Sequence, residues 1–167
     1  MGNPGRRRLN HRPELRHRSG YSLLELVITI LVLGIIASVA TPRLVDSLAG
    51  YRADSAAARI VADLALAQKH ARTTGTSETV TFDRARNRYS FSSITDSDRG
   101  GIVYEVDLTN YPYDAQLTRL KLTSGESITF DGFGFVNGGG KLKITTDGVS
   151  RIIVIDAATG SAQVEGG

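Results

Sequence analysis

The sequence predicts an α+β protein in which one long N-terminal helix packs on a C-terminal antiparallel β domain. Three observations lead to this prediction. An apolar run over residues 21–40 follows a basic leader. Apolar residues then recur at helical spacing as far as Thr74. Beyond Gly75 the period changes to two, and short strand-like segments follow one another without helices between them, which favours antiparallel pairing.

Residues 1–20 form a basic leader with six arginines and one glutamate. The remaining 147 residues hold 14 Lys and Arg against 16 Asp and Glu, a formal charge of −2. A mildly acidic body argues against a surface that binds nucleic acid by neutralising phosphates. The chain has no Cys, which excludes disulfides and cysteine-based sites.

The apolar run over residues 21–40 is long enough to cross a bilayer as a helix. We therefore expect a transmembrane or assembly helix over residues 21–42. The leader arginines would keep its N-terminus in the cytoplasm and place the body outside. The alternative is a secretory signal peptide cleaved after the small residues 37–40.

Glu25 is the single carboxylate in this apolar run. A charge deep in a bilayer costs about 2.5 kcal/mol or more, so an intramembrane Glu marks a candidate functional site. The simpler alternative is a carboxylate favoured by the positive end of the helix dipole.

The helical pattern resumes after Pro42, which we expect to kink or loosen the helix or to end its membrane half. A narrow apolar stripe then predicts an amphipathic helix over residues 43–75. Its members are Ala53, Ala57, Ile60, Leu64, Ala67 and Ala71. Gly75 is the predicted stop.

Residues 76–167 form the predicted β domain, in which turn signals separate eight strand-like segments. These segments cover residues 78–83, 88–92, 102–106, 117–122, 127–130, 141–145, 151–155 and 162–165.

The N-terminal pattern resembles the type IV pilin and type II secretion pseudopilin family. The residues that carry the resemblance are Gly20, the aromatic Tyr21, Leu23-Leu24, Glu25 and, after an apolar run, Pro42. In the body, Phe130-Asp131-Gly132-Phe133-Gly134, residues 151–155 and Thr159-Gly160 are similar to the H-type minor pseudopilins and related minor pilins. The resemblance implies a pilin-like fold.

The resemblance also implies a function. A prepilin peptidase would cut between Gly20 and Tyr21 and methylate the new N-terminus. Glu25 would pair with the terminal amine of a neighbouring subunit. We therefore expect a minor pseudopilin of a type II secretion system, anchored in the inner membrane with its β domain in the periplasm. Other pseudopilins or pilins and the membrane assembly platform would be its partners.

Two alternatives remain. A minor type IV pilin would serve pilus assembly or DNA uptake, but the DNA-uptake members of the family carry arginines after the closing Thr-Gly. The tail over residues 161–167 has no basic residue, which makes DNA an unlikely partner. A signal-anchored binding domain or enzyme on the outer face would have no need of Glu25.

No catalytic constellation is evident, because the predicted mature chain has His70 as its only histidine. We expect His70 to be a surface or packing residue, and we expect no enzyme activity and no cofactor. Asp96 and Asp98 resemble part of a calcium loop but lack further ligands at later positions, so a solvated acidic loop is favoured over a metal site.

Overall fold

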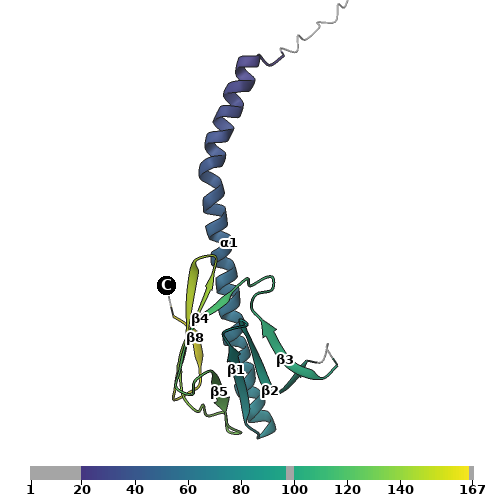
Figure 1. The fold of residues 1–167 in the computed structure, drawn as a ribbon, viewed down its shortest axis with the longest axis vertical. Helices are drawn as coiled ribbons and strands as arrows, with labels where there is room; N and C mark the ends of the chain where they lie inside the picture. The colour runs from purple at the N-terminus through teal and green to yellow at the C-terminus, as the bar shows by residue number, and fades with distance from the viewer. Residues whose placement is uncertain (1–19, 97–99, 166–167) are drawn as a thin grey trace, which may run out of the picture. The chain divides into compact units, whose positions relative to one another are not determined.

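The computed structural model describes residues 20–96 and 100–165, apart from the side chains of residues 39–46. The chain divides into two compact units, Met1–Ala40 and Thr41–Gly167. Helix α1 (Leu23–Thr74) begins in the first unit and ends in the second. Figure 1 shows the strands of the second unit gathered around the C-terminal part of this helix.

Within the second unit, α1 packs through a face made mainly of alanines, with Ile60 and Leu64 as its large side chains. The whole predicted stripe is buried, each member being no more than 1% exposed, and Ala56 is buried beside it. The alanines let the sheets approach the helix closely, and Ile60 and Leu64 fill the space between the two sheets. The helix ends at Gly75, whose N–H donates to the Ala71 carbonyl at 2.9 Å and whose φ of 67° suits a glycine C-cap.

The β domain contains two four-stranded antiparallel sheets. The first has the order β3-β2-β1-β5 and the second the order β4-β6-β7-β8. The strands of the first sheet are β1 (Glu78–Asp83), β2 (Arg88–Asp96), β3 (Ile102–Asp107) and β5 (Ser127–Phe130). Those of the second are β4 (Gln116–Leu122), β6 (Gly140–Thr146), β7 (Val149–Ile155) and β8 (Ala162–Val164).

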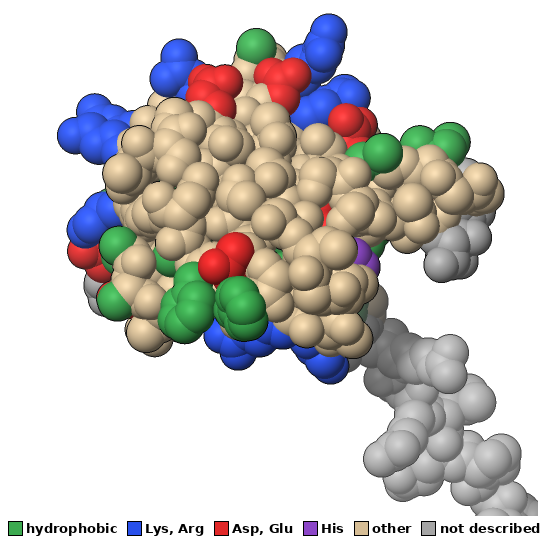
Figure 2. All heavy atoms as spheres, turned by 90° about the horizontal axis from the view of Figure 1, so that it is seen from below, with side chains coloured by type: hydrophobic (Ala, Val, Ile, Leu, Met, Phe, Trp, Pro, Cys, Tyr) green, Lys and Arg blue, Asp and Glu red, His purple; other side chains and the backbone are tan. Residues whose placement is uncertain are grey.

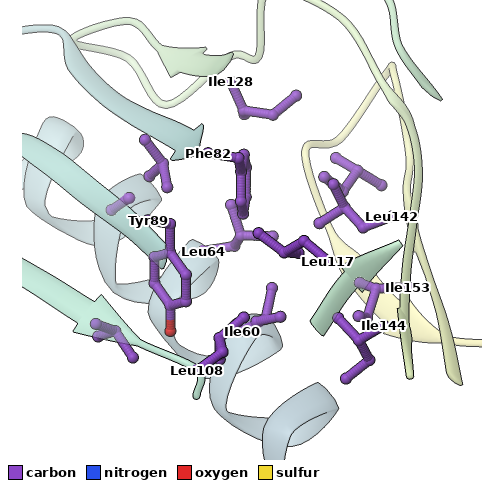
Figure 3. Close-up of a cluster of buried hydrophobic side chains, with 14 of the residues drawn as sticks. Ile60, Leu64, Phe82, Tyr89, Leu108, Leu117, Ile128, Leu142, Ile144 and Ile153 are labelled. Atoms are coloured by element: carbon purple, nitrogen blue, oxygen red, sulfur yellow. The ribbon is translucent and has the colours of Figure 1, made fainter. Parts of the chain in front are cut away.

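One hydrophobic core joins both sheets to the helix (Figure 3). Ile60 and Leu64 enter it from α1, between side chains of the two sheets. The first sheet contributes Phe82, Tyr89 and Ile128, and the second contributes Leu117, Leu142, Ile144 and Ile153. Each of these residues is at most 3% exposed. Neither sheet could bury its inner face without the helix, so the helix and the two sheets form one folding unit.

Ion pairs at the margin of this core orient α1 relative to the second sheet. Arg151 of β7 forms a two-pronged pair with Asp54 of α1, at 2.5 Å from Nε to Oδ1 and 3.2 Å from Nη2 to Oδ2. Arg52 lies 3.4 Å from Asp114 and 3.3 Å from Asp147. These pairs are largely exposed, so each contributes little free energy, but together they fix the helix against the second sheet.

The predicted fold class, a helix packed on an antiparallel β domain, is confirmed. All eight predicted strands are present, with ends that shift by a few residues, most of all in β2, which continues to Asp96. The division into two sheets was not predicted, because the sequence pattern gives strands but not their partners.

Candidate assembly site and the buried polar clusters

The predicted cleavage point lies directly before the start of helix α1. Gly20 and the exposed Tyr21 precede the helix, which begins at Leu23. Ser22 is the N-cap: its hydroxyl accepts a hydrogen bond from the Glu25 N–H at 3.2 Å, and its carbonyl accepts one from the Leu26 N–H at 3.1 Å. Ser and Glu three residues apart are typical of a helix start, so the helix has a defined beginning just beyond the predicted scissile bond.

Glu25 lies in the first turn of α1 and is exposed. Within the part of the chain that the structure describes, its carboxylate has no hydrogen-bond or ion-pair partner. The helix dipole favours a negative charge at this position. A cation from another molecule is therefore free to pair with it, and the role predicted for Glu25 stays a prediction.

The helix after Glu25 exposes apolar side chains all around its circumference. Large aliphatic residues between Leu23 and Ile36 are 47–80% exposed in the single chain. The two hydroxyls of this stretch are satisfied within the helix, since Thr29 donates to the Glu25 carbonyl and Ser38 to the Ile35 carbonyl, each at 2.7 Å. A helix that is apolar on every side needs a covering of lipid or protein.

The structure does not support the predicted membrane-spanning helix over residues 21–42. Among the helices of the described residues, none combines the length and the apolar character that crossing a membrane requires. Pro42 lies inside α1, which continues beyond it, so the proline does not end the helix. The predicted kink at Pro42 stays a prediction.

A polar cluster that the sequence pattern did not reveal lies between α1 and the first sheet. Asp63 is 5% exposed, and its Oδ2 accepts hydrogen bonds from Tyr89 at 2.6 Å and from Arg59 at 2.9 Å. Arg59 also donates to the Tyr104 hydroxyl and lies over the Tyr104 ring, 5.9 Å from its centre. Asp63 lies off the apolar stripe of the helix, yet it is buried, with the Tyr89 hydroxyl of β2 against its carboxylate.

The electrostatics of this cluster follow from its burial. Burial and the adjacent Asp63 carboxylate raise the pKa of the Tyr89 hydroxyl well above its ordinary value, so Tyr89 remains a donor. Burial opposes the charge of Arg59, but the Asp63 carboxylate outweighs it and holds the pKa of Arg59 above its ordinary value. The cluster is a charged anchor between helix and sheet, with no nucleophile or free base.

A second buried carboxylate, Glu78, lies near the end of α1. Its side chain is fully buried and accepts hydrogen bonds from the N–H groups of Ser92 and Ser93, at 2.7 and 3.1 Å, and from both serine hydroxyls. Burial alone would raise the pKa of Glu78, but the hydrogen bonds from Ser93 and Ser92 hold it below its ordinary value. His70 places Nδ1 3.1 Å from the Glu78 Oε2. His70 therefore packs against a buried carboxylate, which accords with a packing role.

Two of the three body segments that resemble the H-type minor pseudopilins, residues 130–134 and 159–160, meet at the helix. Gln68 of α1 donates through Nε2 to the Gly134 carbonyl at 2.9 Å and to the Thr159 carbonyl at 2.7 Å. Asp156 closes the second loop by accepting from the Ala158 N–H and from the N–H and hydroxyl of Thr159. One glutamine side chain thus ties both loops to the helix.

The calcium candidate gains no support. Asp98 lies outside the described residues, and Asp96 ends β2. The described residues contain no group of three or more His, Cys, Asp or Glu side chains arranged to hold a metal ion.

Comparisons with known proteins agree with the N-terminal pattern and with the fold. Residues 15–41 match the prokaryotic N-terminal methylation motif. The type IV minor pilin FimU of Pseudomonas aeruginosa is similar in structure, with 18% identity, a TM-score of 0.51, and coverage of 68% of this chain and 88% of FimU. No curated protein sequence matches this chain.

The minor pseudopilin EpsH from the Type 2 Secretion System of Vibrio cholerae is also similar, with 17% identity, a TM-score of 0.50, and coverage of 68% of this chain and 96% of EpsH. At such identities the likeness concerns the fold. The resemblance seen in the sequence is confirmed: this chain joins the N-terminal methylation motif to the pilin-like fold of the type IV pilin and pseudopilin family.

Proposed function

We propose that this chain is a minor pseudopilin that assembles into the short inner-membrane-based filament of a type II secretion system. The observation that carries the proposal is the methylation motif over residues 15–41 at the head of a pilin-like fold. The proposed role is structural rather than enzymatic.

Maturation would begin at the N-terminus. A prepilin peptidase would cut between Gly20 and Tyr21, and the absence of a side chain at Gly20 would let the backbone enter the peptidase site without a clash. Methylation of the Tyr21 amine leaves it basic, so the mature chain starts with a cation. The structured helix start at Ser22 holds this terminus close to the first helical turn.

Assembly would then bury two features that the single chain exposes. The apolar residues from Leu23 to Ile36 would pack against the same residues of neighbouring subunits, and close packing of apolar side chains would hold the helices together. The Glu25 carboxylate would pair with the Tyr21 amine of a neighbour. An ion pair in an apolar bundle adds little net stability but is costly to break, so it would set the register of one helix against the next.

The membrane placement rests on the motif and on the basic leader. We propose that the apolar start of α1 anchors the subunit at the inner membrane, with residues 1–20 on the cytoplasmic side and the β domain in the periplasm. The proposed partners are other pseudopilins, the prepilin peptidase and the membrane assembly platform.

The test is incorporation of a Glu25→Ala variant into filaments in the bacterium. We expect normal membrane insertion and processing but a sharp loss of incorporation, because the neighbour's amine loses its counter-charge. Thr29→Val is the matched control, since the Thr29 hydroxyl is satisfied inside its own helix. Normal incorporation of Glu25→Ala would remove the pairing role.

A minor pilin is the second candidate, and the likeness to FimU favours it as much as the likeness to EpsH favours the first. Mechanical shearing of the cells distinguishes these two candidate functions. A pilus subunit leaves the cell with the sheared surface fibres, whereas a subunit of a short secretion filament stays with the membrane.

A further inference from the structure

The outer face of the second sheet carries a cluster of four basic residues, here called the cationic face: Arg119 and Lys121 of β4, and Lys141 and Lys143 of β6. Leu142 and Ile144 of β6 point into the core, so by the alternation of a strand Lys141 and Lys143 point outward. The sequence did not reveal this cluster, because β4 and β6 are separated by some twenty residues and only the register brings them together.

The register places like charges directly opposite each other. Arg119 lies opposite Lys143, and Lys121 lies opposite Lys141. Like charges in such cross-strand pairs destabilise a sheet. Lys141 has one partner, Glu165, at 2.8 Å from Nζ to Oε1. In the described part of the chain, Arg119, Lys121 and Lys143 form no ion pair.

Protection of a sheet edge explains only half of the cluster. β4 is the edge strand of its sheet, and basic side chains on an edge strand discourage aggregation. β6 is an interior strand, paired on both sides, and needs no such protection. Lys141 and Lys143 therefore require another explanation.

The four basic side chains surround a hollow of about 160 Å³ that is also lined by Ile152 of β7 and by Leu142, whose own side chain points into the core. Figure 2 shows Lys and Arg side chains along the left margin, the side on which the second sheet lies in Figure 1, and others along the top and the bottom. A hollow ringed by cations fits a carboxylate that reaches in from another molecule.

Two observations favour carboxylates over the phosphates of a nucleic acid. The cluster is compact and contains no aromatic side chain on which a base could stack. The one ligand already present is the Glu165 carboxylate.

We propose that the cationic face docks a carboxylate-rich surface of a neighbouring subunit. Two copies cannot meet through this face on both sides, because cations would oppose cations. The contact is therefore head-to-tail, the type that extends into helical rows instead of closing as a dimer. That the partner is a neighbouring subunit rests on the proposed function, whereas the preference for carboxylates does not.

The test measures binding of the full chain, kept in neutral detergent micelles, to two probes of equal charge: poly-L-glutamate and a duplex DNA. Lys141→Gln with Lys143→Gln reduces the cationic face. Lys69→Gln with Arg84→Gln, both exposed and off this sheet, is the matched control. We expect the wild type to prefer poly-L-glutamate and the first pair to weaken that binding about tenfold, as two partly exposed charge contacts would.

Equal weakening by the control pair, or no binding to either probe, would overturn the proposal. The proposal would also be overturned if the wild type bound DNA more tightly than poly-L-glutamate and Lys141→Gln with Lys143→Gln abolished the DNA binding. That result would indicate a nucleic-acid surface. If circular dichroism shows that Lys141→Gln with Lys143→Gln misfolds, the wild type is instead compared at low and high salt. Binding to poly-L-glutamate through charges should then be lost at high salt. Processing at Tyr21 tests the proposed function separately.

Discussion

The hydrogen bond between Tyr89 and Asp63 gives the sharpest test of how α1 is held to the first sheet. Tyr89→Phe removes a buried hydroxyl that donates to a carboxylate over 2.6 Å. Loss of a hydrogen bond to a charged group costs about 1.5–3 kcal/mol. The carboxylate keeps Arg59 as a partner, so we expect the lower end of this range.

Asp63→Ala is expected to cost more. It leaves the Tyr89 hydroxyl buried without an acceptor and removes the partner of Arg59. Breaking a buried pair costs about 3–5 kcal/mol, and the lower value applies here since the Arg59 side chain is 38% exposed and can reach water. In the Asp63→Ala background, Tyr89→Phe removes the unsatisfied hydroxyl and should be neutral or stabilising.

The assay is a double-mutant cycle on the free energy of unfolding of the full chain in neutral detergent, followed by near-ultraviolet circular dichroism. Tyr51→Phe is the matched control, because Tyr51 is 72% exposed and should show neither a cost nor coupling to Asp63. If the double variant costs as much free energy of unfolding as Asp63→Ala and Tyr89→Phe together, within about 0.5 kcal/mol, the reasoning is refuted.

Two further predictions concern the β domain. The pKa of Glu78 lies below its ordinary 4.5 in the folded chain, so its charge stabilises the fold above that pH, and this stabilisation is lost as the pH falls through the lowered pKa. The stability gap between wild type and Glu78→Gln should therefore shrink in acid titrations, and a constant gap would contradict this. Gly160→Ala should destabilise by about 1–3 kcal/mol, since its Cβ would lie 2.8 Å from Phe130. Gly148→Ala, which has a similar φ but open space, should cost less by thermal melting; equal costs would show that the backbone and not the contact matters.

Periodicity predicted the parts of the fold that local sequence determines. The apolar stripe from Ala53 to Ala71 marks the buried helix face, and Gly75 marks the end of α1, because spacing and capping are properties of neighbouring residues. Strands were predicted for the same reason. Their assignment to two sheets depends on contacts distant in sequence and could not be predicted.

The same limit applies to the candidate sites. Gly20, Tyr21 and Glu25 form a local motif and were recognised from the sequence. Asp63 lies off the apolar stripe, and nothing on its own helix shows that Tyr89 will cover it. The cationic face likewise exists only through the register of β4 against β6. The one available signal in the sequence was that each of these strands carries two basic residues spaced two apart, which places both on one face of the strand.

The mass and N-terminal residue of the protein isolated from its native membrane test the central claim most directly. A chain that begins at methylated Tyr21 is the predicted result, because the methylation motif covers this region and the family resemblance implies cleavage after Gly20. A start near Thr41 would indicate ordinary export, and an intact Met1 a permanent signal anchor. Either result would contradict the account of a processed filament subunit.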